Sequence, residues 1–120
     1  MTGVKGAVKL TPMDKGKHPI LKRFLEGAAP LQSKLRAVYL FGSRARGNER
    51  PDSDYDLLLV AASDFTLEDK SRLYDTVMDV LLETGRLVSL KIFKEKEFQR
   101  LVKLHSPFTE NVLKEGIRIG

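Results

Sequence analysis

Two aspartates at alternate positions are the residues of this sequence best suited to hold a metal ion. Asp54 and Asp56 open an apolar run that ends at Ala61, and this pattern predicts a buried strand. Alternate residues of a strand project from the same face, so the two carboxylates would lie together, whereas Tyr55 and Leu57 would face the other way, into the packing. Two neighbouring carboxylates repel each other unless a cation lies between them, and Mg²⁺ prefers such oxygen ligands. The pair therefore predicts a magnesium site with Asp54 and Asp56 as its protein ligands.

A glycine–serine pair that precedes the aspartates could hold a phosphate. Gly42 has no Cβ, so a phosphate can approach its backbone closely. If Ser43 begins a helical turn, the N–H groups there favour negative charge, and its hydroxyl could bond a phosphate oxygen. Arg44 and Arg46 follow at once and are charge-matched donors. These four residues predict a nucleotide-phosphate site. A merely basic loop is the alternative for Arg44, Arg46 and Arg50, but the position of the arginines beside Ser43 favours phosphate binding.

Together the two clusters resemble the signature of the DNA polymerase β-like nucleotidyltransferase superfamily. The resemblance is greatest to its minimal nucleotidyltransferases and spans roughly residues 36–119. It implies a small polymerase β-like palm in which Asp54 and Asp56 are the catalytic residues and hold two Mg²⁺ ions. In the same palm, Gly42 and Ser43 would hold the β- and γ-phosphates. The matching stretches are Phe41-Gly42-Ser43-x-Ala45-x-Gly47, Ser53-Asp54-x-Asp56-Leu57, and the tail Ser106-Pro107-Phe108 with Asn111-Val112-Leu113-Lys114-Glu115-Gly116.

The same resemblance implies a reaction and a partner. The reaction would transfer a nucleoside monophosphate, AMP from ATP, to a protein acceptor and release pyrophosphate. Minimal members are often antitoxins that silence a small helical HEPN ribonuclease toxin, in some cases by adding AMP to a tyrosine of the toxin. We therefore expect a magnesium-dependent nucleotidyltransferase with a HEPN-type ribonuclease toxin as its partner.

One strand departs from the pattern of active superfamily members. Those members usually carry a third carboxylate on the next long strand, which here is residues 87–93 and contains no acid. Lys91 places a positive charge on this strand instead, unless its side chain points away. Asp79 and Glu83 on the preceding helix are candidate substitutes, although their spacing suits a solvent-exposed helix face equally well.

Two other functions remain open from the sequence. The missing third acid favours a catalytically silent nucleotide-binding module, which would neutralise its partner by forming a complex with it. The basic first part of the chain favours a transferase that acts on a small molecule or an RNA end, because residues 1–50 hold 11 Lys and Arg against 3 Asp and Glu. Such transferases usually add a recognition domain, for which 120 residues leave no space.

The elements that would position these residues form an α+β pattern. Thr66 and Asp69 resemble a capping box at the start of a helix that Gly85 ends. We expect a small mixed sheet with helices packed on one side, in a domain of residues 18–120 that follows a flexible arm of residues 1–17. The expected order is a helix from Pro19, strands at 37–41 and 54–61, a helix to Thr84, a strand at 87–93, a helix at 95–105, a short helix around Val112 and an edge strand at 117–119.

The composition narrows the remaining classes. The chain has no cysteine, which excludes disulfides, thiolate zinc sites and cysteine nucleophiles. Hydrophobic residues make up 42% and charged residues 31%, as in ordinary globular domains. No apolar run approaches the length of a membrane span, and no apolar stretch follows the lysines near the N-terminus. We therefore expect a cytoplasmic protein, with nucleotide preference, acceptor and oligomeric state left open.

Overall fold

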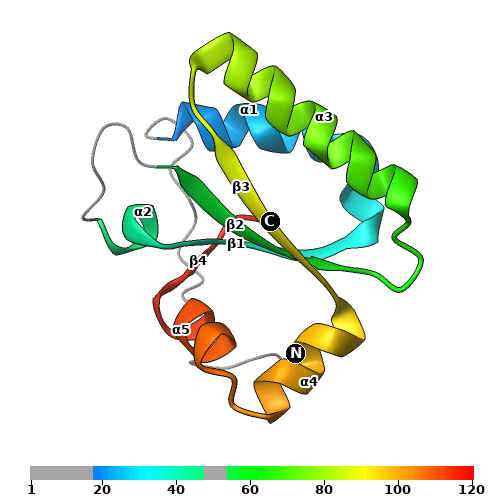
Figure 1. Ribbon diagram of the computed structural model, residues 1–120, viewed down its shortest axis with the longest axis vertical. Helices are drawn as coiled ribbons and strands as arrows, with labels where there is room; N and C mark the ends of the chain where they lie inside the picture. Colours follow the sequence, from blue (N-terminus) through cyan, green and yellow to red (C-terminus); the bar gives the residue numbers. More distant parts are fainter. Residues whose placement is uncertain (1–17, 48–53) are drawn as a thin grey trace.

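A mixed β-sheet forms the centre of the molecule (Figure 1). The computed structural model describes residues 18–47 and 54–120, so the predicted arm at 1–17 lies outside the described residues. Within the described residues the sheet has four strands in the order β3-β2-β1-β4. β1 is antiparallel to both β2 and β4, whereas β2 and β3 are parallel. The strands are β1 (Leu35–Phe41), β2 (Tyr55–Ala61), β3 (Val88–Lys94) and β4 (Ile117–Arg118).

The helices begin and end close to where the sequence predicts. Thr66 caps α3 through a capping box with Asp69, and Gly85 ends that helix with a φ of +74°, so both predictions are confirmed. A 3₁₀ helix, η1 (Ala29–Lys34), extends the first helix towards β1. The α-helices are α1 (Pro19–Ala28), α2 (Ser43–Arg46), α3 (Leu67–Thr84), α4 (Glu95–Lys103) and α5 (Pro107–Glu115).

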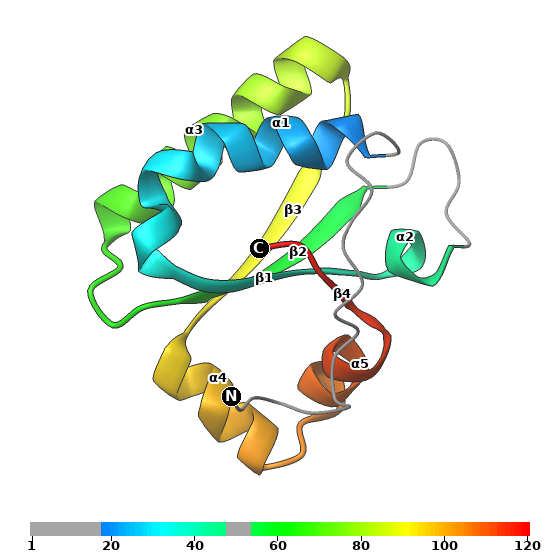
Figure 2. The same cartoon turned by 180° about the vertical axis from the view of Figure 1, so that it is seen from behind.

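Helices cover both faces of the sheet, whereas we expected them on one side. The α+β class and the mixed sheet are confirmed, but α1 and α3 lie against one face and α4 and α5 against the other (Figures 1 and 2). The physical reason lies in β2, where Leu57 and Leu59 face α1 and α3 while Leu58 and Val60 face α4 and α5. A strand that is apolar on both faces needs cover on both.

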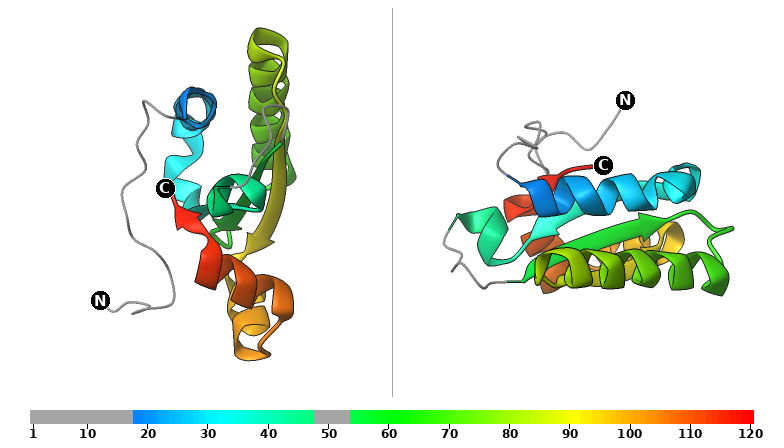
Figure 3. Two further views of the ribbon diagram at one scale, coloured as in Figure 1. Left: turned by 90° about the vertical axis from the view of Figure 1, so that its left-hand side faces the viewer. Right: turned by 90° about the horizontal axis from the view of Figure 1, so that it is seen from above.

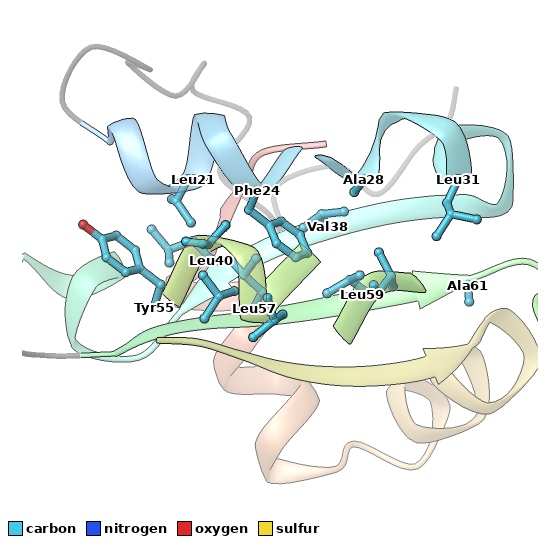
Figure 4. Close-up of a cluster of buried hydrophobic side chains, with 14 of the residues drawn as sticks. Leu21, Phe24, Ala28, Leu31, Val38, Leu40, Tyr55, Leu57, Leu59 and Ala61 are labelled. Atoms are coloured by element: carbon cyan, nitrogen blue, oxygen red, sulfur yellow. The ribbon is translucent and has the colours of Figure 1, made fainter. Parts of the chain in front are cut away.

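The larger core lies between the sheet and the α1–α3 layer. In Figure 3, α1 and α3 run side by side along the same side of the sheet. Figure 4 shows Tyr55, Leu57, Leu59 and Ala61 of β2 on the face that carries this core, beneath side chains of α1 such as Phe24. None of the described helices is long and apolar enough to cross a membrane.

Candidate functional site

A glycine turn joins β1 to α2 and leaves room for a carboxylate. Gly42 has a φ of +79°, a backbone conformation that favours glycine. A Cβ placed on Gly42 would lie 2.6 Å from Oδ2 of Asp56. The carboxylate of Asp56 therefore occupies the space that a side chain at residue 42 would need. Ser43 begins α2, as predicted, while its side chain and that of Arg46 lie outside the described part of the structure.

The two aspartates lie close together at the beginning of β2. Asp56 pairs across the sheet with Phe41 and is half-buried, and Asp54 lies just before the strand and is exposed. Burial raises the pKa of the Asp56 carboxyl, and the nearby negative charge of Asp54 raises it further. None of the ion pairs formed among the described residues involves either aspartate. The effect of Asp54 on the pKa of Asp56 shows that the two carboxylates are near enough to repel each other.

Arg44 lies over the aromatic ring of Tyr55. The guanidinium carbon is 3.9 Å from the ring centroid, a cation–π contact. Tyr55 alternates with the two aspartates along β2 and packs in the core beneath α1 and α3, as its position in the sequence predicts. The contact therefore places the Arg44 side chain beside that core. Its predicted role in nucleotide binding stays a prediction, as do the roles of Ser43 and Arg46.

Strand β3 borders the aspartates with a serine and a lysine. Because β2 and β3 are parallel, Asp56 pairs with Ser89, and Leu58 pairs with Lys91. Paired residues of neighbouring strands project from the same face, so Ser89 and Lys91 share the face of Asp56. The positive charge of Lys91 partly offsets the rise in the pKa of Asp56. Lys91 thus does not point away from the site, and Ser89 stands directly beside Asp56.

The candidate substitutes for a third carboxylate do not reach this site. Asp79 and Glu83 belong to α3, which covers the opposite face of the sheet. The carboxylate of Glu83 accepts hydrogen bonds from Nε and Nη2 of Arg23 at 3.1 and 2.8 Å. In the part of the chain that the structure describes, no group of three or more acidic, histidine or cysteine side chains could hold a metal ion. Both side chains are exposed, so of the two alternatives that the sequence left open for Asp79 and Glu83, the structure supports the solvent-exposed helix face.

The donor set nevertheless suits a magnesium ion with few protein ligands. Asp54 and Asp56 offer carboxylate oxygens, and Mg²⁺ is usually bound by one or two carboxylates, with water and phosphate oxygens as its other ligands. The exposure of Asp54 leaves the site open to such ligands. The glycine turn beside Asp56 adds backbone without a side chain, where a polyphosphate can approach. The residues present therefore fit a metal–nucleotide site.

Comparison with known proteins places the chain in a family. Residues 25–119 match the family model described as "Polymerase beta, Nucleotidyltransferase". This match covers the sheet, α2 to α5 and both halves of the candidate site. The chain therefore belongs to this family of nucleotidyltransferase enzymes. The enzyme class predicted from the sequence is confirmed at this level.

Two curated relatives come from Methanocaldococcus jannaschii. "Putative protein adenylyltransferase MJ0604" is 32% identical over 85 residues, which cover 71% of this chain and 78% of the relative. "Putative protein adenylyltransferase MJ0141" is 34% identical over 77 residues, which cover 63% of this chain and 78% of the relative. Among solved structures, a chain of "Crystal structure of the toxin-antitoxin with AMP-PNP" is 17% identical, with a TM-score of 0.49 and coverage of 88% of this chain and 72% of that chain.

Proposed function

We propose that this chain is a magnesium-dependent nucleotidyltransferase that transfers AMP from ATP to a protein acceptor. The observation that carries the proposal is the pair Asp54 and Asp56, of which Asp56 lies against the glycine turn at residue 42. Membership of the nucleotidyltransferase family supports the reaction class. Both relatives carry the name "Putative protein adenylyltransferase", and these names support a protein as the acceptor.

In this proposal the acidic residues of the site bind the metal ion, and the glycine turn and the basic residues bind the phosphates. Asp54 and Asp56 would hold Mg²⁺, which neutralises phosphate charge when it is bound. Gly42 and Ser43 would receive the β- and γ-phosphates at the turn, with Arg44 and Arg46 as nearby cations. In the transfer, a hydroxyl oxygen of the acceptor bonds to the α-phosphorus, the bond between the α-phosphorus and the bridging oxygen breaks, and pyrophosphate leaves. The hydroxyl proton goes to water, to which the exposed side of the site at Asp54 is open.

The acceptor in this proposal is a HEPN-type ribonuclease toxin, and the chain is its antitoxin. The signature around Gly42 and Asp54 and the tail from Ser106 to Gly116 support this, because both resemble minimal nucleotidyltransferases that act as antitoxins. A surface stripe on α3 is available for a helical partner. It consists of large apolar side chains at helical spacing that are exposed to solvent, namely Leu67, Tyr74, Met78 and Leu82.

The proposal is tested by incubating the chain with α-labelled ATP, Mg²⁺ and the proteins that co-purify with it. We expect label on the partner protein, and we expect the double substitution Asp54→Ala and Asp56→Ala to abolish the labelling. Asp64→Ala is the matched control, since Asp64 is an exposed acid that follows the end of β2 distant from Asp54 and Asp56 and lies outside α3. The proposal fails if the wild-type chain labels no co-purifying protein.

A catalytically silent antitoxin is the second candidate, and Ser89 favours it. A serine stands beside Asp56 on β3, where active superfamily members usually carry a carboxylate. A silent module would bind the nucleotide and neutralise its partner by forming a complex. Asp54→Asn separates the two candidates in a toxin-neutralisation assay. A transferase loses neutralisation with this substitution, whereas a silent module keeps it and loses it only when the α3 stripe is changed, for example by Met78→Asp.

A further inference from the structure

The face of β3 that borders the aspartates carries a fixed positive charge. Ser89 and Lys91 lie on the same face of the sheet as Asp56, and the Lys91 side chain is exposed. Lys91 pairs with Leu58, two residues along β2 from Asp56, so the Lys91 and Asp56 side chains leave the same face of the sheet on neighbouring strands. A lysine therefore borders the metal ligands on the strand from which a third carboxylate would otherwise come.

Counting charges at the site argues against a second bound metal ion. The two carboxylates together carry two negative charges, which balance a single divalent ion. A second ion would have to share these two carboxylates or be held by phosphate oxygens alone, because in the described part of the chain no third acid joins Asp54 and Asp56. A second divalent ion beside Lys91 would also repel the lysine ammonium.

We propose that Lys91 takes the place of the second metal ion. Asp54 and Asp56 hold one Mg²⁺, and the Lys91 ammonium binds a phosphate oxygen of the same nucleotide. This inference rests on the proposed nucleotidyltransferase function and specifies how its site is completed without a third carboxylate. An ammonium group is a compact point charge with three donors, and lysine is a common ligand of phosphates.

The chain offers a matched control for Lys91 on the same strand. Lys94 lies three residues further along β3, so its side chain leaves the opposite face of the sheet. Its ammonium donates a hydrogen bond to the carbonyl oxygen of Ser63 at 3.2 Å, away from the aspartates. Lys94→Ala removes the same charge from the same strand without touching the site.

The first test counts metal ions directly. The wild-type chain is titrated with Mn²⁺ in the presence of a non-hydrolysable ATP analogue, and bound Mn²⁺ is measured by electron paramagnetic resonance. We expect one Mn²⁺ per bound nucleotide. Two Mn²⁺ per nucleotide would overturn the inference and leave the proposed function in place. A wild-type chain that binds no nucleotide with either metal would overturn the proposed function, and the inference with it.

The second test removes the Lys91 ammonium and then supplies a carboxylate that could hold a second metal ion in its place. Lys91→Ala is expected to weaken binding of the analogue by about tenfold, the loss expected for one charge-assisted hydrogen bond, whereas Lys94→Ala changes it less than about twofold. Adding Ser89→Asp to Lys91→Ala supplies a third carboxylate beside Asp56. This double variant is expected to bind two Mn²⁺ per nucleotide and to regain affinity. Equal affinities for the Lys91→Ala and Lys94→Ala variants, with both chains folded by circular dichroism, would overturn the inference.

Discussion

The two faces of β2 have different roles in the molecule, although the same seven residues form both. On the face towards α1 and α3, Tyr55, Leu57, Leu59 and Ala61 are all buried in one continuous core. On the other face, Leu58 and Val60 are buried beneath α4 and α5, but the strand begins with a half-buried aspartate beside an exposed one. One face is closed along its whole length, and the other opens at one end.

This difference shows how a small domain can support a site that is unfavourable on its own. Asp56 has a raised pKa because its negative charge is partly buried beside that of Asp54. Such a site costs folding free energy unless a cation is present. The core beneath α1 and α3 stabilises the same strand from its other face. We therefore expect substitutions on the closed face to change stability and substitutions at the open end to change ligand binding.

Leu57→Ala should give the largest effect and should act on stability alone. Leu57 has an exposed fraction of 0%, so its truncation leaves a cavity and is expected to lower the free energy of unfolding by about 2–5 kcal/mol. Leu67→Ala is the matched control, because Leu67 is 84% exposed and its loss should cost less than about 0.5 kcal/mol. Urea denaturation measures both. Equal losses for the two variants would show that this face is not the main source of stability.

Gly42→Ala should have a smaller effect on stability than Leu57→Ala and should also weaken nucleotide binding. The added Cβ would strain a backbone with φ of +79° and push against Oδ2 of Asp56. We expect a loss of about 1–2 kcal/mol in stability and about tenfold weaker nucleotide binding with Mg²⁺. Gly85→Ala has a similar φ of +74° but open space around the Cβ, so it should lose stability and keep its affinity. Unchanged nucleotide binding in the Gly42→Ala variant would show that the turn is not part of the nucleotide site.

As the pH falls, the contributions of Asp69 and Asp56 to folding stability should change in opposite directions. These changes are the smallest effects that we expect. Hydrogen bonds from the Lys34 ammonium and from the backbone and side chain of Thr66 lower the pKa of Asp69 below its ordinary value of 3.8. A lowered pKa means that ionised Asp69 stabilises the fold above about 3.8 and that this contribution is lost as pH falls through the folded value. The raised pKa of Asp56 means that its ionised form destabilises the fold, and that the penalty disappears as pH falls through its folded value.

Urea denaturation in EDTA at a series of pH values separates the two. The stability advantage of wild type over Asp69→Asn should be constant near neutral pH and shrink in acid. The stability of wild type relative to Asp56→Asn should instead improve as the pH falls. A shift of the same sign for both variants would contradict the view that one carboxylate belongs to the fold and the other to the site.

Local sequence signals predict most of the fold and the residues of the candidate site. The capping box at Thr66 and the glycine at residue 85 predict the ends of α3, because each acts through backbone groups within a few residues. The alternation of Asp54, Tyr55 and Asp56 predicts that the tyrosine enters the core and that the aspartates do not. These features depend on periodicity and capping, which a single sequence contains.

Contacts between distant elements could not be predicted in the same way. That Ser89 stands beside Asp56 follows only from the parallel register of β2 and β3, which the residues of either strand do not specify alone. Asp79 and Glu83 lie away from the site because α3 covers the opposite face of the sheet. Which face α3 covers depends on the path of the whole chain. The stacking of Arg44 on Tyr55 likewise joins two segments that residues 48–53 separate in the sequence.

The central claim is that Asp54 and Asp56 hold a divalent ion against a nucleotide at the glycine turn, and one calorimetric experiment tests it most directly. A non-hydrolysable ATP analogue is titrated into the wild-type chain with Mg²⁺ and with EDTA, and the titration is repeated with the Asp54→Ala and Asp64→Ala variants. We expect binding that needs Mg²⁺, is lost in Asp54→Ala and is kept in Asp64→Ala. Nucleotide binding of equal strength in EDTA, or in Asp54→Ala with Mg²⁺, would contradict it.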